Sequence, residues 1–179
     1  LKYEEQTEGT AVGWVLGSSL HVRQIFINIL GNAIKYTDAG GYVLCQVTIK
    51  AIGESLISCQ TVISDNGIGM STAFLPHLFE PFSRENTDKK SVTQGTGLGM
   101  SIVKHLIDKM DGTVTVESKK GVGTIFTVTL LFEGLKEQEC KKIEEEDQNV
   151  DLSGMRVLLA EDNELNMEIA ETFLTDAGV

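Results

Sequence analysis

The sequence predicts a chain of the α/β (α+β) class, in which helices and hairpins of strands share one core. Two stretches have apolar residues at helical spacing, and four β-rich runs form two pairs, each joined by a short turn. The chain has 179 residues, which is enough for one domain with a hydrophobic core and a remainder.

The first helix is predicted from Ser18 or Ser19 to about Tyr36. Serine caps a helix N-terminus by accepting a backbone N–H, and Gly40-Gly41 provides a stop signal. One side of this helix is apolar and is expected to face the core. Its residues are Val22, Phe26, Ile29 and Ala33.

Two hairpins are predicted from paired β-rich runs. Tyr42–Ala51 and Ser55–Ser64 form the first, with a glycine-containing turn between them. Thr113–Glu117 and Gly123–Phe132 form the second. Residues 1–6 are expected to add an edge strand.

The segment 65–97 is polar, bears glycines and contains both prolines of the chain. It is long for a connection inside a compact domain, and such loops are often functional lids. A second helix is predicted over Leu98–Met110 and ends at Asp111-Gly112. Its apolar residues are Leu98, Ile102, Val103, Leu106, Ile107 and Met110.

The C-terminal part has a different charge. Residues 133–151 carry 8 acids and 3 lysines, so residues 133–154 are predicted to form an acidic linker between residues 1–132 and 155–179. Met155–Ala160 is a continuous apolar run that predicts a buried parallel strand, and Glu164–Ala177 is predicted to be helical.

Composition excludes several classes of function. The net charge is −11, whereas residues 1–132 are nearly neutral with 12 acids and 11 bases, so no basic stripe is available for nucleic acid. No run of about 18 apolar residues predicts a membrane span. The three cysteines form no CxxC pair; Cys45 and Cys59 are expected to be buried thiols in a reducing cytoplasm. The chain begins with Leu1 and is expected to be a fragment.

Asn28, Asn32 and Lys35 share one helical stripe because their spacing is i, i+4, i+7. Asparagine is a poor helix former, so two on one stripe need a reason. Carboxamide oxygens can ligate Mg²⁺ and a lysine can neutralise phosphate, which predicts one wall of a nucleotide triphosphate site. The alternative is a solvated helix face.

Asp65-Asn66-Gly67-Ile68-Gly69 directly follows a predicted strand. A carboxylate there can accept a hydrogen bond from an adenine amino group, and glycines let the backbone approach the ring. Taken alone, the motif is also good turn chemistry.

Gly95-Thr96-Gly97-Leu98-Gly99 opens the second helix. Successive glycines let backbone N–H groups point into one concavity, and the helix N-terminus adds positive potential, so the motif predicts a phosphate cradle. A flexible hinge into the helix is the alternative.

Two further motifs contribute single residues. Phe79-Glu80-Pro81-Phe82-Ser83-Arg84 predicts phenylalanines that anchor the lid and an arginine that reaches a phosphate, with a surface arginine as the alternative. Residues 121–126 predict a tight turn into a strand that brings Thr124 near the base.

In chain order the motifs are Asn-x₃-Asn-Ala-x-Lys, Asp-x-Gly-x-Gly, Phe-x-Pro-Phe, Gly-x-Gly-x-Gly and Gly-x-Gly-Thr-x-Phe. Together they resemble the catalytic ATP-binding domain of sensor histidine kinases, and the resemblance covers residues 1–132. It implies a two-layer sandwich, the Bergerat ATP-binding fold, with a mixed β-sheet covered by a helical layer. ATP is then expected between the helices and a lid over residues 70–97.

The resemblance also implies residue roles. Asn28 and Asn32 hold Mg²⁺ and phosphate oxygens, Lys35 contacts phosphate, Tyr36 lines the base pocket and Asp65 binds the adenine amino group. The other implied ATP-binding residues are Gly67, Ile68, Gly69, Arg84, Gly95, Thr96, Gly97, Leu98, Gly99 and Thr124.

The residue at position 28 separates related chemistries. ATP-hydrolysing relatives resemble the pattern Glu-x₃-Asn, whose glutamate activates water, whereas this chain has Asn28. A carboxamide takes no proton at neutral pH, so the expected reaction is phosphoryl transfer to a separate acceptor.

Histidine kinases phosphorylate a histidine in a motif like Ser-His-Glu-x-Arg-Thr-Pro, on an upstream helical hairpin. The histidines here are His21, His77 and His105, and none has that context. The chain is therefore expected to bind ATP and not to phosphorylate itself.

Residues 155–166 resemble the start of a response-regulator receiver domain. There Glu161 and Asp162 bind Mg²⁺ in an intact receiver; the alternative is a strand that ends in an acidic turn. A receiver after a kinase domain is the hybrid histidine kinase arrangement. Because a lone strand lacks sheet partners, residues 155–179 are expected to be poorly ordered or to pack opportunistically.

The sequence thus predicts the ATP–Mg²⁺-binding fragment of a protein-histidine kinase in two-component signalling. Expected partners are the histidine-bearing dimerisation hairpin and the receiver domain of the parent protein, with no nucleic acid and no membrane contact. The expected location is the cytoplasm, whether or not the parent is membrane-anchored. Two alternatives stay open: a nucleotide-sensing scaffold without transfer, and an ATPase of the wider superfamily.

Overall fold

The computed structural model describes residues 2–9, 14–53, 55–85, 96–135, 154–160, 164–176 and 178. The chain divides into two units, Leu1–Leu135 and Lys136–Val179.

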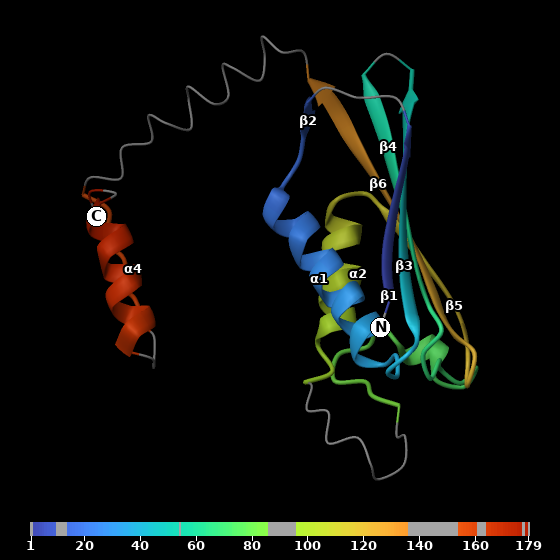
Figure 1. Ribbon diagram of the computed structural model, residues 1–179. Helices are drawn as coiled ribbons and strands as arrows, with labels where there is room; N and C mark the ends of the chain where they lie inside the picture. The colour runs from blue at the N-terminus through green and yellow to red at the C-terminus, as the bar shows by residue number, and fades with distance from the viewer. Residues whose placement is uncertain are drawn as a thin grey trace. The chain divides into compact units, whose positions relative to one another are not determined.

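The first unit contains a mixed β-sheet with α1 (Ser19–Lys35) and α2 (Gly99–Lys109) on one side of it (Figure 1). The strand order is β1-β3-β4-β6-β2, and β5 also pairs with β6. β1 runs parallel to β3, and the other pairs are antiparallel. The predicted two-layer fold class is confirmed. The strands are β1 (Lys2–Gly9), β2 (Trp14–Leu16), β3 (Tyr42–Ile52), β4 (Leu56–Asp65), β5 (Thr113–Lys119) and β6 (Gly123–Leu135).

Capping residues set the ends of α1 close to their predicted positions. The Ser18 side chain accepts a hydrogen bond from the His21 backbone N–H at 3.3 Å, which satisfies a donor of the first turn. At the other end the Tyr36 N–H donates to the Asn32 carbonyl at 2.9 Å, and the Thr37 hydroxyl donates to the Ala33 carbonyl at 2.7 Å. The helix therefore stops just before the turn that leads into β3.

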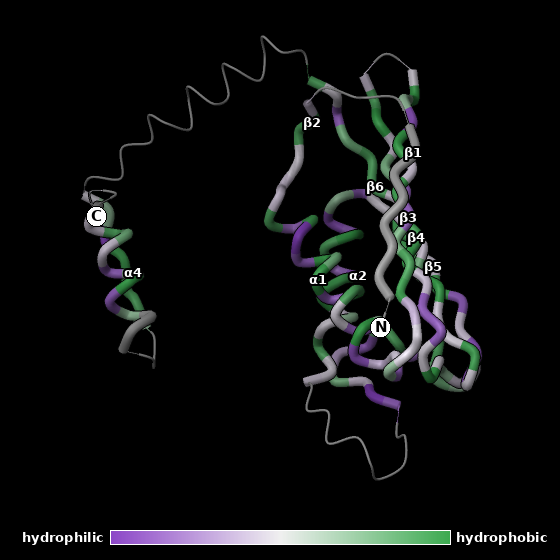
Figure 2. The backbone as a smooth tube through the Cα atoms, viewed as in Figure 1, coloured by the Kyte–Doolittle hydropathy of each residue, from purple (hydrophilic) through white to green (hydrophobic). Residues whose placement is uncertain are grey.

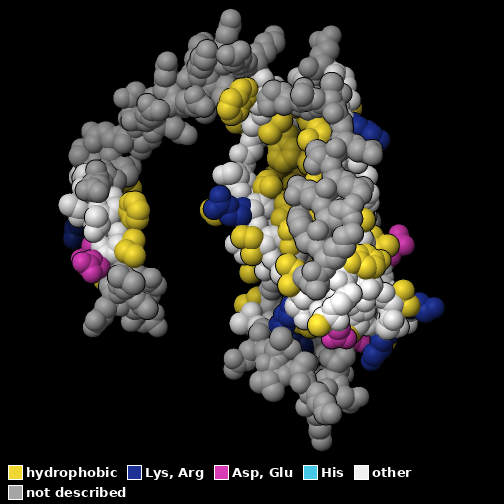
Figure 3. Space-filling view, viewed as in Figure 1, with side chains coloured by type: hydrophobic (Ala, Val, Ile, Leu, Met, Phe, Trp, Pro, Cys, Tyr) yellow, Lys and Arg dark blue, Asp and Glu magenta, His cyan; other side chains and the backbone are white. Residues whose placement is uncertain are grey.

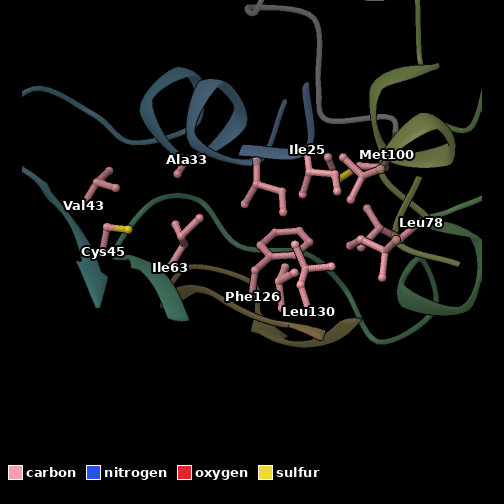
Figure 4. Packing of buried hydrophobic residues seen from close by; sticks show 13 residues of the cluster. Ile25, Ala33, Val43, Cys45, Ile63, Leu78, Met100, Phe126 and Leu130 are labelled. Carbon is pink, nitrogen blue, oxygen red and sulfur yellow. The ribbon is translucent and has the colours of Figure 1, made fainter. Parts of the chain in front are cut away.

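The core lies between the helices and the sheet (Figure 4). The helices contribute Ile25, Ile29 and Ala33 from α1 and Met100, Val103 and Ile107 from α2. Figure 2 shows hydrophobic and hydrophilic residues alternating along both helices, as expected for helices that bury one face. The sheet contributes Val43, Cys45, Ile63, Phe126, Val128 and Leu130.

The buried face of α1 is offset slightly around the helix axis from the predicted apolar face. Val22 and Phe26 are partly buried, whereas Ile25 is fully buried and lies outside the predicted stripe. Ile102, one of the apolar residues at helical spacing in the second helix, is 39% exposed. Periodicity alone gives the centre line of an apolar stripe, and packing against a twisted sheet decides which flank each helix buries. Cys59 is expected to be buried like Cys45 and is only half-buried.

Apolar side chains also reach the surface of the first unit, as the face in Figure 3 shows. On α1 the exposed apolar residues are Leu20, Ile27 and Ile34. They have the same chemistry as the core residues of the helix and differ in burial, so they provide matched controls for core substitutions.

α2 begins at Gly99 and ends at Lys109, one residue inside the predicted range at each end. Its C-terminus closes when the Gly112 N–H donates to the Ile107 carbonyl at 2.9 Å, with Asp111 at a positive φ of 51°. β6 continues past the predicted end at Phe132 to Leu135, because β2 pairs with its last residues.

The second unit contains α4 (Glu164–Asp176), as predicted for this segment. The predicted strand at Met155–Ala160 is wrong: the structure has no strand there. A strand needs a neighbour that accepts and donates its backbone hydrogen bonds, and the described residues of this unit include no other strand. Glu161 and Asp162 lie outside the described residues. Among the described residues, no helix has both the length and the apolar character to cross a membrane.

Replacing a core residue of α1 should destabilise the first unit far more than the same replacement on its surface. Ile29 is 0% exposed and Ile27 is 59% exposed. We expect Ile29→Ala to lower the free energy of unfolding by about 2–5 kcal/mol, because it leaves a cavity. Ile27→Ala should change it by less than about 0.5 kcal/mol. Urea unfolding followed by circular dichroism measures both, and equal effects would contradict the assigned helix face.

Candidate functional site

A cavity of about 330 Å³ lies in the first unit, where the C-terminal half of α1, the start of α2, the end of β4 and the start of β6 meet. The structure brings most of the predicted site residues together around it. These are Asn28, Asn32, Lys35, Tyr36, Asp65, Ile68, Gly69, Arg84, Thr96, Gly97, Gly99 and Thr124.

Three predicted residues do not line the cavity in the described structure. Gly95 lies outside the described residues. Leu98 is the residue before α2 and its carbonyl accepts the Ile102 N–H at 3.0 Å. Gly67 packs under the end of α1, where an added Cβ would lie 2.3 Å from the Tyr36 carbonyl oxygen. Gly67 thus allows two backbones to touch and is not itself part of the cavity wall.

The wall from α1 presents amide groups and one ammonium. The Asn28 Nδ2 donates to the Gln24 carbonyl at 2.8 Å, which directs its Oδ1 away from its own helix. That oxygen meets the first residue of α2, since a Cβ added to Gly99 would lie 2.9 Å from it. The Lys35 Nζ lies 5.1 Å from the Tyr36 ring centroid, a cation–π distance. This wall therefore offers an oxygen ligand and a cation beside a helix N-terminus.

The cavity lining also contains a carboxylate that is held by hydrogen bonds. Asp65 is the last residue of β4, and its Oδ1 accepts the Gly67 backbone N–H at 2.9 Å. Burial raises the pKa of Asp65 above its ordinary value, and hydrogen bonds from the Gly67 and Thr124 backbone N–H groups oppose that shift. The carboxylate is oriented by its own turn and lies opposite Thr124 in the register of β4 and β6.

Two glycines hold the segment after Asp65 against the β5–β6 turn. Gly69 has φ +59°, and a Cβ there would lie 2.1 Å from the Lys119 carbonyl oxygen. Gly123 has φ +133°, and a Cβ there would lie 2.0 Å from the Asp65 carbonyl oxygen. The glycines of the Asp-x-Gly-x-Gly motif are predicted to let the backbone approach a ligand. In the structure they let backbone approach backbone, and a ligand contact stays a prediction.

The described ends of the lid segment pair with each other. The Phe82 N–H donates to the Gly97 carbonyl at 3.1 Å, and both residues have positive φ, 62° and 73°. Phe79 packs against the core, but Phe82 is 71% exposed, so the prediction that both phenylalanines anchor the lid is wrong for Phe82. Glu85 accepts the Ser71 N–H with both carboxylate oxygens, at 3.2 and 3.3 Å.

Sequence reasoning missed several residues around the cavity. Most are apolar and also belong to the core or its margin, so their sequence signal was that of ordinary packing. The missed lining residues are Ala33, Met70, Phe74, Leu78, Ser83, Glu85, Met100 and Phe126. Ser118 was also missed; it hydrogen-bonds to Met70 and Thr124 from β5, which no local motif indicates.

The residues present fit a magnesium nucleotide. The cavity lining includes amide side chains, an ammonium and the first residue of α2, which suit phosphates. It also includes a carboxylate and the apolar Ile68, Met70 and Phe126, which suit a flat base with a polar edge. Among the described residues no group of three His, Cys, Asp or Glu side chains could hold a metal ion alone. A cation here needs oxygens from the ligand, which is typical of Mg²⁺ bound with phosphates.

Residues 17–134 match the family described as histidine kinase-, DNA gyrase B-, and HSP90-like ATPase. The chain belongs to this family. Within it the chain is a catalytic ATP-binding domain of the sensor histidine kinase type, as its relatives show. It is 34% identical over 98% of its length to the autoinducer 2 sensor kinase/phosphatase LuxQ of Vibrio parahaemolyticus. It is 35% identical over 91% of its length to the sensor histidine kinase RcsC of Escherichia coli.

The chain spans only 20% of the LuxQ sequence and 16% of the RcsC sequence. Solved structures agree with the family. A mycobacterial sensor histidine kinase, MprB, aligns with a TM-score of 0.58 and 27% identity, over 75% of this chain and 85% of that one. Full-length ShkA in complex with AMPPNP aligns with a TM-score of 0.59 and 26% identity, over 99% of this chain and 34% of that one.

The raised pKa of Asp65 predicts a pH-dependent stability. A carboxyl group with a raised pKa in the folded state stabilises the fold fully below its unfolded pKa, and this contribution is lost as the pH rises through the folded pKa. The variant Asp65→Asn has a carboxamide in place of this carboxyl group, and a carboxamide cannot ionise.

We therefore expect the free energy of unfolding of Asp65→Asn, relative to the wild type, to increase as the pH rises from the unfolded-state pKa to the folded-state pKa of Asp65. Above that range the difference should level off. Urea unfolding at several values between about pH 3 and about pH 7 measures the difference. A difference that falls as the pH rises would show that the Gly67 and Thr124 hydrogen bonds outweigh burial.

Proposed function

We propose that this domain binds ATP with Mg²⁺ and donates the γ-phosphoryl group to a histidine on a separate helical hairpin of its parent protein. One observation carries the proposal: the polar stripe of α1 and the carboxylate of Asp65 line the same cavity. A nucleotide triphosphate has complementary ends, with anionic phosphates and a base that has an amino edge. Membership of the family supports ATP as the ligand.

In this proposal Asn28, Asn32 and Lys35 bind the phosphates and position them. Mg²⁺, when bound, supplies neutralisation of phosphate charge. Asn28 contacts α2 through its oxygen and offers no group that can take a proton from water. Hydrolysis needs a base that takes a proton from the attacking water, and a carboxamide cannot act as that base. A carboxamide at this position therefore favours phosphoryl transfer over hydrolysis.

The acceptor is proposed to come from another segment. None of the chain's three histidines lines the cavity. The Nδ1 atom of His77 lies 3.0 Å from the Oε1 atom of Glu80, and His105 is an exposed residue of α2. The chain spans 20% of the LuxQ sequence and 16% of the RcsC sequence, which leaves room in such a protein for a histidine-bearing hairpin. The sequence resemblance of residues 155–166 to the start of a receiver supports a hybrid kinase in two-component signalling. We propose that this domain acts in the cytoplasm.

Transfer can be tested with γ-labelled ATP, the chain and the histidine-bearing hairpin of the parent supplied separately. We expect label to appear on the hairpin and not on the chain. Release of labelled phosphate without a labelled hairpin would indicate an ATPase. Binding of ATP with neither product would indicate a nucleotide-sensing module. A hairpin with its histidine replaced by glutamine serves as the control.

Adding one negative charge to the phosphate wall should weaken binding. We expect Asn32→Asp to lower the affinity for ATP with Mg²⁺ by about tenfold or more, because the new carboxylate repels the phosphates and an amide contact is lost. Gln24→Glu is a matched control, since this substitution adds the same charge on the same helix at a residue that does not line the cavity. Isothermal titration calorimetry measures both, and equal affinities in the two variants would contradict the assigned wall.

A further inference from the structure

Ser118 sits in the middle of a hydrogen-bond network beside the cavity, although it does not line the cavity itself. It is a half-buried residue of β5. The Met70 backbone N–H donates to its Oγ at 2.8 Å, and its hydroxyl donates to the Gly123 carbonyl at 3.0 Å. The Thr124 Oγ1 lies 2.9 Å from the same oxygen. The side chain thus joins the segment after Asp65 to the start of β6.

The chemistry of these partners fixes the direction of the Ser118–Thr124 hydrogen bond. A backbone N–H can only donate, so Ser118 accepts from Met70. A carbonyl can only accept, so Ser118 uses its one hydrogen on Gly123. Ser118 has no hydrogen left for Thr124, but it has a second lone pair. The Thr124 hydroxyl must therefore be the donor, and its hydrogen points to Ser118.

This direction leaves Thr124 with lone pairs and no hydrogen for any other partner. Thr124 is 7% exposed, lines the cavity and is paired with Asp65 across β4 and β6. An ionised Asp65 also only accepts hydrogen bonds. At this end of the cavity, both polar side chains consequently present acceptors.

We infer that Ser118 is a positioning residue for base selection, which holds the Thr124 hydroxyl as an acceptor so that the site takes a purine with a 6-amino group and rejects one with a 6-oxo group. At position 6 an amino group brings hydrogens to the two acceptors, whereas an oxo group faces them with lone pairs, and the adjacent N1–H of such a base can satisfy at most one of them. The inference rests on the nucleotide-binding function proposed above, and it adds the residue that sets the hydrogen-bond pattern of the site.

A purely structural role for Ser118 makes a different prediction. If Ser118 only ties Met70 to β5, its loss loosens the segment after Asp65 and weakens binding of every nucleotide alike. If it sets the direction of the Thr124 hydroxyl, its loss frees that hydroxyl to rotate and donate to a 6-oxo group. The ratio of affinities for two purines therefore separates the two roles.

The test compares binding of ATP and inosine triphosphate, which carries a 6-oxo group, to the 179-residue chain by isothermal titration calorimetry with Mg²⁺ present. We expect the wild type to prefer ATP and Ser118→Ala to reduce that preference by about fivefold or more, the effect of one directed hydrogen bond. Thr115→Ala, an exposed residue of the same strand, is the control and should keep the wild-type ratio. In a Thr124→Val background, adding Ser118→Ala should not change the ratio further.

Ser118→Cys gives a second variant, because a thiol is similar in shape to a hydroxyl, somewhat larger, and hydrogen-bonds only weakly. This variant should also lower the ratio of the affinity for ATP to that for inosine triphosphate. The inference is overturned if both Ser118 variants keep the wild-type ratio, or if Ser118→Ala still changes the ratio when Thr124 is replaced by valine. A wild-type chain that binds neither nucleotide overturns the proposed function itself. A chain that binds ATP with an unchanged ratio in the variants overturns only the role of Ser118.

Discussion

The burial of one face of α1 against the sheet is the constraint on which the rest of the first unit depends. Ile25, Ile29 and Ala33 are inaccessible or nearly so, and each adds apolar area that leaves water on folding. An α-helix has 3.6 residues per turn, so fixing this face also fixes the rotation of every other side chain on the helix. The polar stripe at Asn28 and Asn32 is thereby turned toward the cavity and toward the start of α2. The packing of α1 against the sheet therefore fixes both its core face and the face that lines the cavity.

A second constraint acts on the other side of the cavity, where backbone segments approach each other too closely for side chains. Gly67 touches the end of α1, Gly69 touches β5 and Gly123 touches Asp65. These contacts place the turn after β4 between the helix and the β5–β6 turn, and hydrogen bonds from Gly67 and to Ser118 then hold its polar groups. The partly buried carboxylate of Asp65 carries a cost, seen as a raised pKa, that the fold tolerates at its site.

The described cavity has the amide of Asn28 in its lining, and none of the chain's three histidines lines it. This fits a family in which an ATP-binding domain works within a longer chain, and the matched sensor kinases are several times longer than this one. In the function proposed above, binding and transfer are separate tasks, and this domain supplies positioning and charge neutralisation.

The sequence by itself determined the elements of the first unit and most of the residues around its cavity. Helix caps, hairpin turns and apolar periodicity are local signals, so the ends of α1 and α2 and the two hairpins lie close to where they were predicted. Tertiary structure decided what depends on neighbours distant in the chain. Packing on the sheet buries Ile25 of α1 and leaves Ile102 of α2 39% exposed, and Phe82 is exposed where its backbone pairs with Gly97. The apolar run at Met155–Ala160 is not a strand, because a strand forms only against a partner. Ser118 shows the same rule at the site: its role comes from Met70 and Thr124, which only the fold brings beside it.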